Sequence, residues 1–442
     1  MSVRSHFRPR HKRLAVALLA LLLAYVVSSL DWCPPRGGGS IAIQASETAH
    51  GTLQAGAGKA EISPPFPVAI AGYGPARPKA DANQTPLFVR AVVLQVGHVR
   101  IGLVSIELLT PPPSLASSIP QALKKLGISE LWTVATHTHS SMGSYEPSLP
   151  FQVGGVGIYR EAAHNAIIQA VEAALVNAAN SLVPVKLEFG TTTAPALVAS
   201  RNAAEPQADP RVTRAVFRSH QTKIAELTIF SAHPTLFPHK SKKLSADYPG
   251  EFSQTLEQEE EGVVLFFQGT VGNARANVPT SSADTNSLVS LFAASLARAA
   301  KETPLQPIEA SRLTFTRVST PLPRADASRL LPGFLRNIGD NVLCRFAPST
   351  AQLSLLRIGP LSLLLVPVEV TYSAGVALES ESGATRVVSL ADDYIGYLDS
   401  PNHVQTSSGE SRLQYYSPEL LDTLTAAAAT AYVENERMSP SK

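Results

Sequence analysis

A hydrophobic run that ends in two histidines places the strongest constraint on this chain. Residues 131–136 are apolar or β-branched, and they lead into His137-Thr138-His139 and then into small polar residues. This order predicts a buried strand followed by a loop. Residues two apart on a strand share a face, so His137 and His139 are expected to point into one pocket, where imidazoles bind a metal or carry protons. Taken alone, so short a motif is more often two inert, hydrogen-bonded histidines.

The same arrangement recurs twice further along the chain. The apolar strand predicted at 224–230 is followed by His233, and Pro234 ends that strand. A second apolar run, 361–368, is followed by Glu369, a carboxylate that is costly at such a place unless it is paired or binds a metal. Histidine and carboxylate side chains at strand ends are therefore candidate metal ligands.

The surrounding pattern predicts the fold class. Strands at 90–96 and 100–106 form a hairpin, and a helical segment at 113–126 leads into the first histidine strand. Strand, helix and strand make a right-handed βαβ unit that carries His137 and His139 at the carboxyl end of its second strand. We therefore expect an α/β (α+β mixed) protein, one large catalytic domain with mixed β-sheets and flanking helices.

The amino terminus has the pattern of an export signal. Basic residues cluster between Arg4 and Arg13, and residues 14–30 carry no charge. We assign 1–31 to a signal peptide or signal anchor, 32–50 to a flexible linker, 51–436 to the catalytic domain and 437–442 to a tail. An uncleaved anchor would place the domain outside the cytoplasm at a membrane, and cleavage would make it secreted or periplasmic. A formal net charge of +2 gives no sign of a nucleic-acid partner.

Cys33 and Cys344 are the only two cysteines. They lie far apart in the sequence, so they predict no disulfide framework, and neither has the spacing of a metal ligand. Asp31 and Trp32 precede Cys33 where a lipoprotein signal needs small residues, which argues against a lipid anchor. Any metal is expected to be held by histidine and oxygen.

Several motifs in order resemble the neutral/alkaline, non-lysosomal ceramidases, zinc amidases that cleave the N-acyl bond of ceramide. The resemblance covers about 56–430. The motifs are Ala55-Gly-Ala-Gly-Lys-Ala-Glu-Ile-Ser-Pro64, Thr136-His137-Thr138-His139-Ser140, Ser231-Ala232-His233-Pro234-Thr235, Ser245-Ala246-Asp247-Tyr248-Pro249-Gly250, Gln268-Gly269-x-x-Gly272-Asn273, Pro367-x-Glu369-x-Thr371 and Tyr394-x-x-Tyr397.

The resemblance implies roles for single residues and a lipid amide as substrate. It implies zinc bound by four residues, a catalytic residue beside the metal, a pocket that binds substrate, and a tyrosine that hydrogen-bonds the substrate carbonyl. The implied zinc ligands are His137, His233, Glu369 and Tyr397, and the implied catalytic residue is His139. The implied pocket residues are Arg201 and Asn202, and the tyrosine is Tyr415 or Tyr416. Tyr73 lies between glycines on a loop that could also line the site, although a packed aromatic in a turn is the commoner case.

One segment departs from the family pattern. Where these ceramidases carry Gly-Asp-x-Ser-Pro, this chain has Gly272-Asn273-Ala274-Arg275-Ala276, so no serine hydroxyl is available. The family's carboxy-terminal immunoglobulin-like domain is also expected to be missing. Water would then be the nucleophile, with Arg275 contacting the carbonyl or an anionic group of the substrate. The alternatives are a non-catalytic lipid-binding protein of the same fold and a zinc hydrolase of another amide or ester.

Two other metal hydrolases that use a similar motif are disfavoured. An amidohydrolase barrel needs eightfold strand-helix alternation, which the chain lacks. A metallo-β-lactamase needs an aspartate where Ser141 stands.

Overall fold

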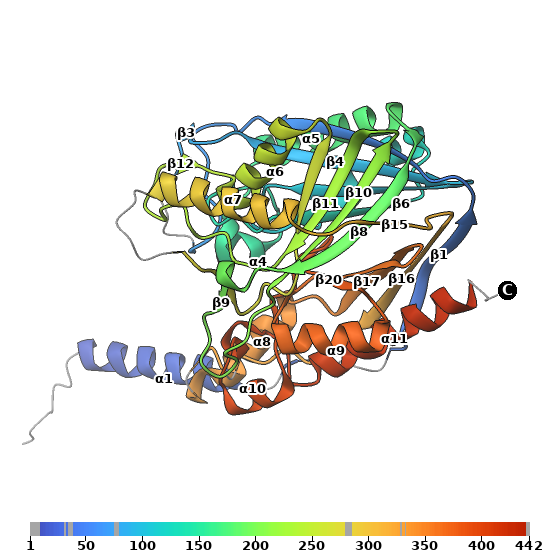
Figure 1. The fold of residues 1–442 in the computed structure, drawn as a ribbon. Coiled ribbons are helices and arrows are strands. Elements are labelled where there is room, and N and C mark those ends of the chain that lie inside the picture. Colours follow the sequence, from blue (N-terminus) through green and yellow to red (C-terminus); the bar gives the residue numbers. More distant parts are fainter. Residues whose placement is uncertain are drawn as a thin grey trace, which may run out of the picture.

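The structure, a computed structural model, has a mixed α/β fold in which helices cover three five-stranded sheets (Figure 1). It describes residues 9–30, 32–33, 39–74, 79–278, 285–327, 329–331 and 333–438. Part of the predicted basic segment (1–8), part of the predicted linker (34–38) and most of the predicted tail (439–442) lie outside the described residues. The prediction of a mixed α/β fold is confirmed.

The first sheet contains the predicted hairpin and βαβ unit. β4 and β5 pair antiparallel, and β6 returns parallel to β5 after the crossover through α2 (Leu115–Ser118) and α3 (Pro120–Leu126). Both predictions are therefore confirmed. Across the sheet the strands are β6 (Glu130–Ala135), β5 (Val99–Ile106), β4 (Leu87–Val96), β2 (Gln54–Ile62) and β7 (Val183–Pro184).

Two further sheets and three short pairs complete the β structure. The second sheet has the order β13 (Val263–Gln268), β11 (Thr222–Phe230), β10 (Arg211–Ser219), β8 (Lys186–Thr193) and β15 (Gln306–Ile308). The third has the order β1 (Ala42–His50), β16 (Arg312–Pro321), β17 (Thr350–Ile358), β18 (Leu361–Leu365) and β20 (Arg386–Val388). The pairs are β3 (Ala82–Asn83) with β12 (Lys243–Leu244), β9 (Val198–Ser200) with β14 (Ala274–Ala276), and β19 (Glu369–Val370) with β21 (Tyr397–Leu398).

One hydrophobic core joins the inner faces of all three sheets. Trp132 of the first sheet packs edge-to-face on Phe315 of the third, with ring centroids 5.5 Å apart, and Phe267 of the second sheet belongs to the same cluster. Burying aromatic side chains of this size contributes strongly to the stability of a core. The three sheets therefore fold as one unit, and strand ends from different sheets are held at fixed positions.

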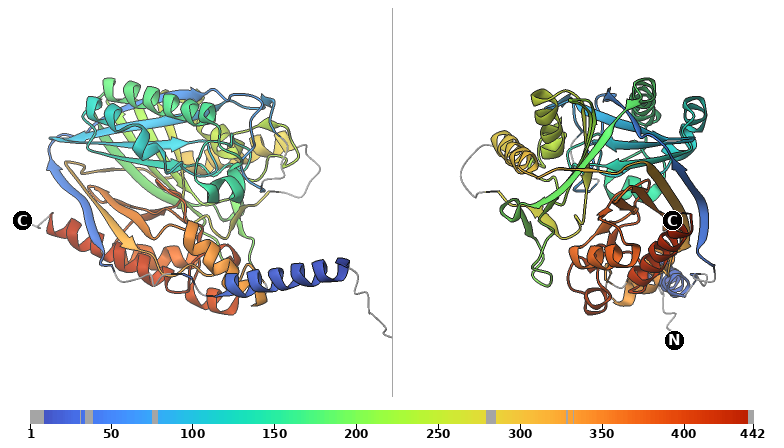
Figure 2. Two further views of the ribbon diagram at one scale, coloured as in Figure 1. Left: turned by 180° about the vertical axis from the view of Figure 1, so that it is seen from behind. Right: turned by 45° about the vertical axis from the view of Figure 1, so that its right-hand side comes forward.

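Helices cover the outer faces of the sheets (Figures 1 and 2). α5 packs on β2, where a Cβ added to Gly58 would lie 2.1 Å from the carbonyl oxygen of Ala174, so the Ala-Gly-Ala-Gly strand allows this close approach. The remaining helices are α1 (Pro9–Ser29), α4 (Leu149–Phe151), η1 (Gln152–Val156), α5 (Glu161–Asn180), η2 (Pro195–Leu197), α6 (Asp247–Glu259), α7 (Thr285–Lys301), η3 (Gly333–Leu335), α8 (Arg336–Phe346), α9 (Tyr372–Ser382), α10 (Pro401–Thr406), η4 (Ser411–Leu413) and α11 (Leu420–Arg437).

The segment predicted as a flexible linker contains a strand. Residues 42–50 form β1, which pairs antiparallel with β16, and hydroxyl groups pair across the two strands at Thr48 and Thr314 (2.8 Å). The prediction was wrong here because an edge strand with one exposed face is polar in composition and resembles a linker. The folded body thus begins before residue 51.

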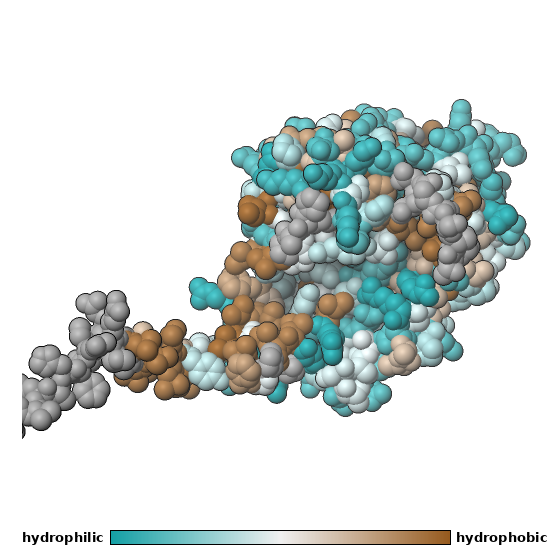
Figure 3. All heavy atoms as spheres, turned by 90° about the vertical axis from the view of Figure 1, so that its left-hand side faces the viewer, coloured by the Kyte–Doolittle hydropathy of each residue, from teal (hydrophilic) through white to brown (hydrophobic). Residues whose placement is uncertain are grey.

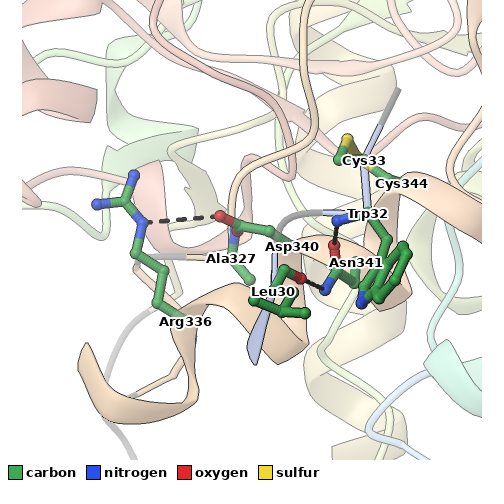
Figure 4. The surroundings of a disulfide bond; sticks show 8 residues. All are labelled: Leu30, Trp32, Cys33, Ala327, Arg336, Asp340, Asn341 and Cys344. Atoms are coloured by element: carbon green, nitrogen blue, oxygen red, sulfur yellow. Dashed lines mark hydrogen bonds and ion pairs between the residues drawn. A yellow bond between two sulfur atoms is a disulfide. The ribbon is translucent and has the colours of Figure 1, made fainter. Parts of the chain in front are cut away.

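The prediction that the cysteines form no disulfide was also wrong. Cys33 and Cys344 are bonded across 311 positions of sequence, with their Cα atoms 5.7 Å apart (Figure 4). Distance along the chain does not limit which cysteines meet in a fold, so sequence separation gave no guidance. Beside the disulfide, the side chain of Asn341 in α8 donates to the carbonyl of Leu30 (2.6 Å) and accepts from the backbone N–H of Trp32 (2.9 Å).

Helix α1 projects from the body and carries many exposed apolar side chains. Leu14, Val16 and Leu21 are each at least 60% exposed, and α1 packs only at its carboxyl end, where it meets α8. Apolar surface continues from α1 onto the adjoining part of the body (Figure 3). Among the described residues, no helix combines the length and apolar content needed to cross a bilayer.

Candidate metal centre

Polar side chains from three sheets meet where the strands end. His137 follows β6, His233 follows β11, and Glu369 opens β19, the short strand that comes after β18. The predicted convergence of His137 and His139 is found, but strand alternation is not its cause. The strand ends at Ala135, and His137 has a left-handed backbone with a φ of 70°. A turn, rather than the pleat of a strand, therefore directs the two rings toward each other.

Three atoms form the centre of the site. The Nε2 atoms of His137 and His233 lie 3.2 and 3.0 Å from one oxygen, Oε2 of Glu369. The other ring nitrogen of each histidine, Nδ1, donates to a backbone carbonyl, at Leu109 (2.8 Å) and Ala274 (2.9 Å). A neutral imidazole has only one N–H group, so in the neutral form of each ring the Nε2 atom presents a lone pair to the carboxylate.

A glutamine amide fixes the two histidine segments relative to each other. Gln268, the last residue of β13, donates from Nε2 to the carbonyl of Thr136 (2.9 Å) and to the carbonyl of Ala232 (3.2 Å). These carbonyls immediately precede His137 and His233. The motif residue Gln268 thus acts as a positioning residue for both rings.

Tyrosines surround the carboxylate and the second histidine. Tyr397 Oη lies 3.1 Å from His233 Nε2, and Tyr394 Oη donates to Oε1 of Glu369 (2.8 Å). Arg201 donates to Tyr397 Oη (2.8 Å) and to the carbonyl of Gly272 (3.0 Å), and it forms an ion pair with Glu410 (2.9 Å). Tyr397 therefore stands beside the three central atoms, where the resemblance expected a ligand.

His139 lies on the open side of the centre. Its Nε2 is 3.3 Å from Nε2 of His137, and its ring packs 5.1 Å from the ring of Tyr73, which is 49% exposed. Tyr73 also contacts the ring of His239 at 5.7 Å. The predicted loop residue Tyr73 thus borders the entrance to the site next to His139.

Burial and neighbouring charges favour the neutral forms of His139 and His233 and the ionised form of Glu369. Burial disfavours the ionised form of Glu369, yet the neighbouring His137 and His233 hold its pKa well below the usual value. Burial and the nearby Arg201 cation lower the pKa of His233 to about 4, and burial together with the other two imidazoles lowers the pKa of His139 well below its usual value. Burial and Glu369 raise the pKa of Tyr397.

These residues fit a divalent metal ion. Lone pairs that face each other at about 3 Å without a hydrogen between them repel, and a cation between them removes that repulsion. Ring nitrogens of His137, His139 and His233 lie within 4.8 Å of one another, which is a spacing that one ion can bridge. Both Nδ1 atoms are already bound to carbonyls, as is usual for metal-ligating histidines.

The other predicted site residues lie at different distances from this centre. Tyr415 is partly buried near Glu369, and burial followed by the charge of Glu369 raises its pKa, whereas the hydroxyl of Tyr416 donates to the carbonyl of Pro348 in the core. The structure therefore favours Tyr415 of the two. Arg275 is exposed on β14, and its backbone adjoins His233. Asn202 lies behind Arg201, close to Gly409.

Asn273, in the segment that departs from the family pattern, has a structural role. Its amide donates to the carbonyl of Gln207 (2.7 Å) and accepts from the backbone N–H of Tyr372 (3.0 Å). The sequence analysis missed this role, and it missed the contacts of Tyr394 with Glu369 and of Glu410 with Arg201. Tyr394 belongs to the Tyr394-x-x-Tyr397 motif, so that motif could have indicated its place in the site. No sequence motif contains Glu410.

Comparison with known proteins identifies the family. The family described as "Neutral/alkaline non-lysosomal ceramidase, N-terminal" matches residues 53–297, more than half of the chain. The protein belongs to the neutral/alkaline non-lysosomal ceramidases. The suspected resemblance is thereby confirmed. No match was found among curated proteins.

Solved ceramidase structures share the fold of this family member. The neutral ceramidase from Pseudomonas aeruginosa superposes with a TM-score of 0.75 at 20% identity, over 88% of this chain and 75% of that chain. A ceramidase complexed with C2 gives a TM-score of 0.74 at 18% identity, over 88% of this chain and 76% of that chain. At such identities the likeness concerns the fold, and the chemistry must be argued from the residues themselves.

Proposed function

We propose that this ceramidase-family protein is a zinc-dependent hydrolase of an amide bond in a lipid-like substrate, acting as an N-acylsphingosine amidohydrolase. One observation carries the proposal: the lone pairs of His137 Nε2 and His233 Nε2 converge on Oε2 of Glu369. Zinc is the cation that two imidazoles and a carboxylate hold in hydrolytic sites. Tyr397 is the proposed fourth ligand.

A zinc ion held by these residues would polarise the scissile carbonyl and lower the pKa of a water molecule to about 7. The chain supplies the remaining functions. His139, on the open side of the centre, would accept a proton from the attacking water and return it to the leaving amine, a role worth roughly 10²–10⁴ in rate. Arg201 holds the hydroxyl of Tyr397 in place, and Tyr415 is proposed to hydrogen-bond the substrate carbonyl.

Water as the nucleophile agrees with the segment around Asn273. The side-chain amide of Asn273 is fully buried and bonded on both sides, so it is not available to attack a carbonyl. Arg275 is proposed to reach an anionic group of the substrate from the exposed face of β14. The same segment favours the second candidate function, a lipid-binding protein that kept the fold and lost the reaction.

We further propose that the protein is exported and acts outside the cytoplasm, held at a membrane by its apolar amino-terminal segment or released by cleavage. The Cys33–Cys344 disulfide supports export, because disulfides persist in oxidising compartments. The exposed apolar face of α1 supports contact with lipid. Cell fractionation with immunodetection tests this proposal, and recovery of the protein in the cytosol with both thiols reduced would contradict it.

The decisive experiment combines metal analysis with turnover on the full chain. We expect zinc bound at this centre and release of fatty acid from a fluorescent ceramide; the activity and the ion at this centre should both be lost in His137→Ala and in His233→Ala. His98→Ala, in the exposed β4–β5 turn, is the matched control and should change neither. Zinc with cleavage of other N-acyl amides or esters only would reassign the substrate. Zinc without turnover of any panel member would support the lipid-binding alternative, and activity in His137→Ala would exclude the zinc mechanism.

A further inference from the structure

A second group of metal-ligating side chains lies behind the wall of the first site. Ligand atoms of Glu205, Asp399 and His403 lie within 4.8 Å of one another. Asp399 is fully buried and follows β21 two residues after Tyr397, whereas His403 belongs to α10 and Glu205 to the loop after β9. Figure 1 shows this loop descending from β9 to α10. The group therefore joins segments that are distant in sequence.

One carboxylate oxygen in this group lacks a partner. Oε1 of Glu205 accepts from the backbone N–H of Ser373 (2.6 Å), whereas its Oε2 is buried and has no hydrogen bond to any described residue. Glu205 is only 6% exposed, so bulk water does not satisfy this atom. An unsatisfied buried carboxylate oxygen costs several kcal/mol unless a proton or cation fills the place.

The nearby arginine does not neutralise the carboxylates of this group. Arg201, an arginine close by, is already engaged by Glu410 and Tyr397. His403 Nδ1 contacts Asp399 Oδ1 at 2.8 Å, so one imidazole faces two buried carboxyl groups. A side chain at residue 409 would fill the adjoining space, since a Cβ on Gly409 would lie 2.4 Å from Asp399 Oδ2 and 3.0 Å from His403 Nδ1.

We propose that Glu205, Asp399 and His403 bind a second metal ion, a structural Zn²⁺ distinct from the one at His137. An imidazole with two carboxylates suits zinc, whereas Ca²⁺ and Mg²⁺ take oxygen ligands. The ion replaces the proton that His403 shares with Asp399 and satisfies Oε2 of Glu205. The ring of His403 is 12% exposed and gives the ion a path from solvent.

The second ion would stabilise the first site indirectly. It would tie the loop of Glu205, which carries Arg201 and thereby contacts Tyr397 Oη, to the segment that follows Tyr397. Its residues are positioning residues for the reaction, because none of them contacts the three central atoms. Binding therefore should raise the thermal unfolding temperature, independently of turnover.

Metal stoichiometry tests the proposal on the full chain. After removal of metal by a chelator, titration with Zn²⁺ followed by elemental analysis should give two ions per chain in the wild type. Glu205→Gln and His403→Asn should each bind one, as should His137→Ala, and Glu205→Gln combined with His137→Ala should bind none. Glu419→Gln is the matched control, since Glu419 is an exposed carboxylate that belongs to neither group, and it should bind two.

The outcomes separate this inference from the proposed function. Retention of the first ion in Glu205→Gln reports an intact fold, and His403→Asn provides an independent variant. The wild type could also bind a single ion. If Glu205→Gln removes that ion and His137→Ala retains it, the result would support the second site and contradict zinc at the first. A single ion removed only by His137→Ala, or two ions retained in both Glu205→Gln and His403→Asn, would overturn the second site.

Discussion

Nε2 of His233 lies 3.0 Å from Oε2 of Glu369, although the two residues are 136 positions apart in the sequence. Neither atom has a hydrogen to offer, because the Nδ1 proton of His233 is bound to the carbonyl of Ala274 and the carboxylate is ionised. The folded chain thus holds two acceptors against each other, and this relationship makes the centre a candidate cation site.

Glu369→Gln should abolish metal binding at the His137–His233 centre while preserving the fold. The amide has the size of the carboxylate, and its N–H₂ group can donate to His233, so the variant replaces the cation with a hydrogen bond. We expect the metal affinity of this centre to fall at least tenfold, with little change in the unfolding temperature. Metal retained at the wild-type level would show that the carboxylate is not a ligand.

His139→Ala should separate catalysis from metal binding. His139 faces the centre from its open side and is proposed to move protons, so its loss should lower kcat by roughly 10²–10⁴. Metal content should stay at the wild-type level, because His137, His233 and Glu369 remain. The measurement is kcat alongside elemental analysis of the same preparation. Loss of the metal together with the activity would instead make His139 a ligand.

Tyr394→Phe and Tyr397→Phe form a matched pair that distinguishes an indirect contact from a ligand. Tyr394 donates to Oε1 of Glu369, and removing such a partner typically weakens metal affinity by 10–100-fold. Tyr397→Phe removes the proposed fourth ligand itself, so we expect a larger loss of affinity. Competition with a chromogenic chelator measures both affinities. Equal effects would place Tyr397 outside the set of ligands.

Removing the disulfide should destabilise the protein. Cys344→Ser should lower the free energy of unfolding by about 2–4 kcal/mol under non-reducing conditions. Cys33→Ser should have the same effect, and the double variant should be no less stable than either single one, because all three lack the same bond. Denaturant unfolding of the full chain measures this. Additive losses would show that each cysteine contributes through packing of its own.

Asp247 should make stability depend on pH. Burial raises its pKa to about 6, although its carboxylate accepts from the backbone N–H groups of Phe237 (2.9 Å) and Tyr248 (2.6 Å). The unfolded value is about 4, so the native state binds the proton more tightly and stability falls as pH rises from about 4 to about 6, by about 3 kcal/mol.

Asp247→Asn should remove most of this decrease and keep the left-handed backbone, which asparagine tolerates. Burial also raises the pKa of Asp393 to about 6, so part of the slope should remain in Asp247→Asn and disappear when Asp393→Asn is added. Urea unfolding between pH 4 and pH 7 measures the slope. An unchanged slope in the double variant would assign it to other groups.

Local patterns predicted much of the site but little of what holds it together. His137, His233 and Glu369 could be found because each follows an apolar strand, a pattern that needs no tertiary information. The roles of Gln268, which bridges the two histidine segments, and of Glu410, which pairs with Arg201, depend on contacts between distant segments. Such contacts leave no trace in spacing or composition.

The two fold errors share a physical cause. β1 is polar because one of its faces is exposed, and the Cys33–Cys344 bond joins residues that only the completed fold brings together. Periodicity reports burial along one segment, so it detects central strands such as β5 and misses polar edge strands. Strands and disulfides that form only through contacts with distant segments therefore could not be predicted from local sequence patterns.

The disulfide closes residues 33–344 into a covalent ring, which contains His137 and His233 and leaves Glu369 outside it. A single proteolytic cut anywhere between Cys33 and Cys344 leaves the two fragments linked, so α1 stays attached to the folded protein. Shedding of the body from its apolar helix requires either a cut between α1 and Cys33, or a cut after Cys33 together with a reductant. The redox state of the surroundings, in addition to any protease, thus decides whether the two parts can separate.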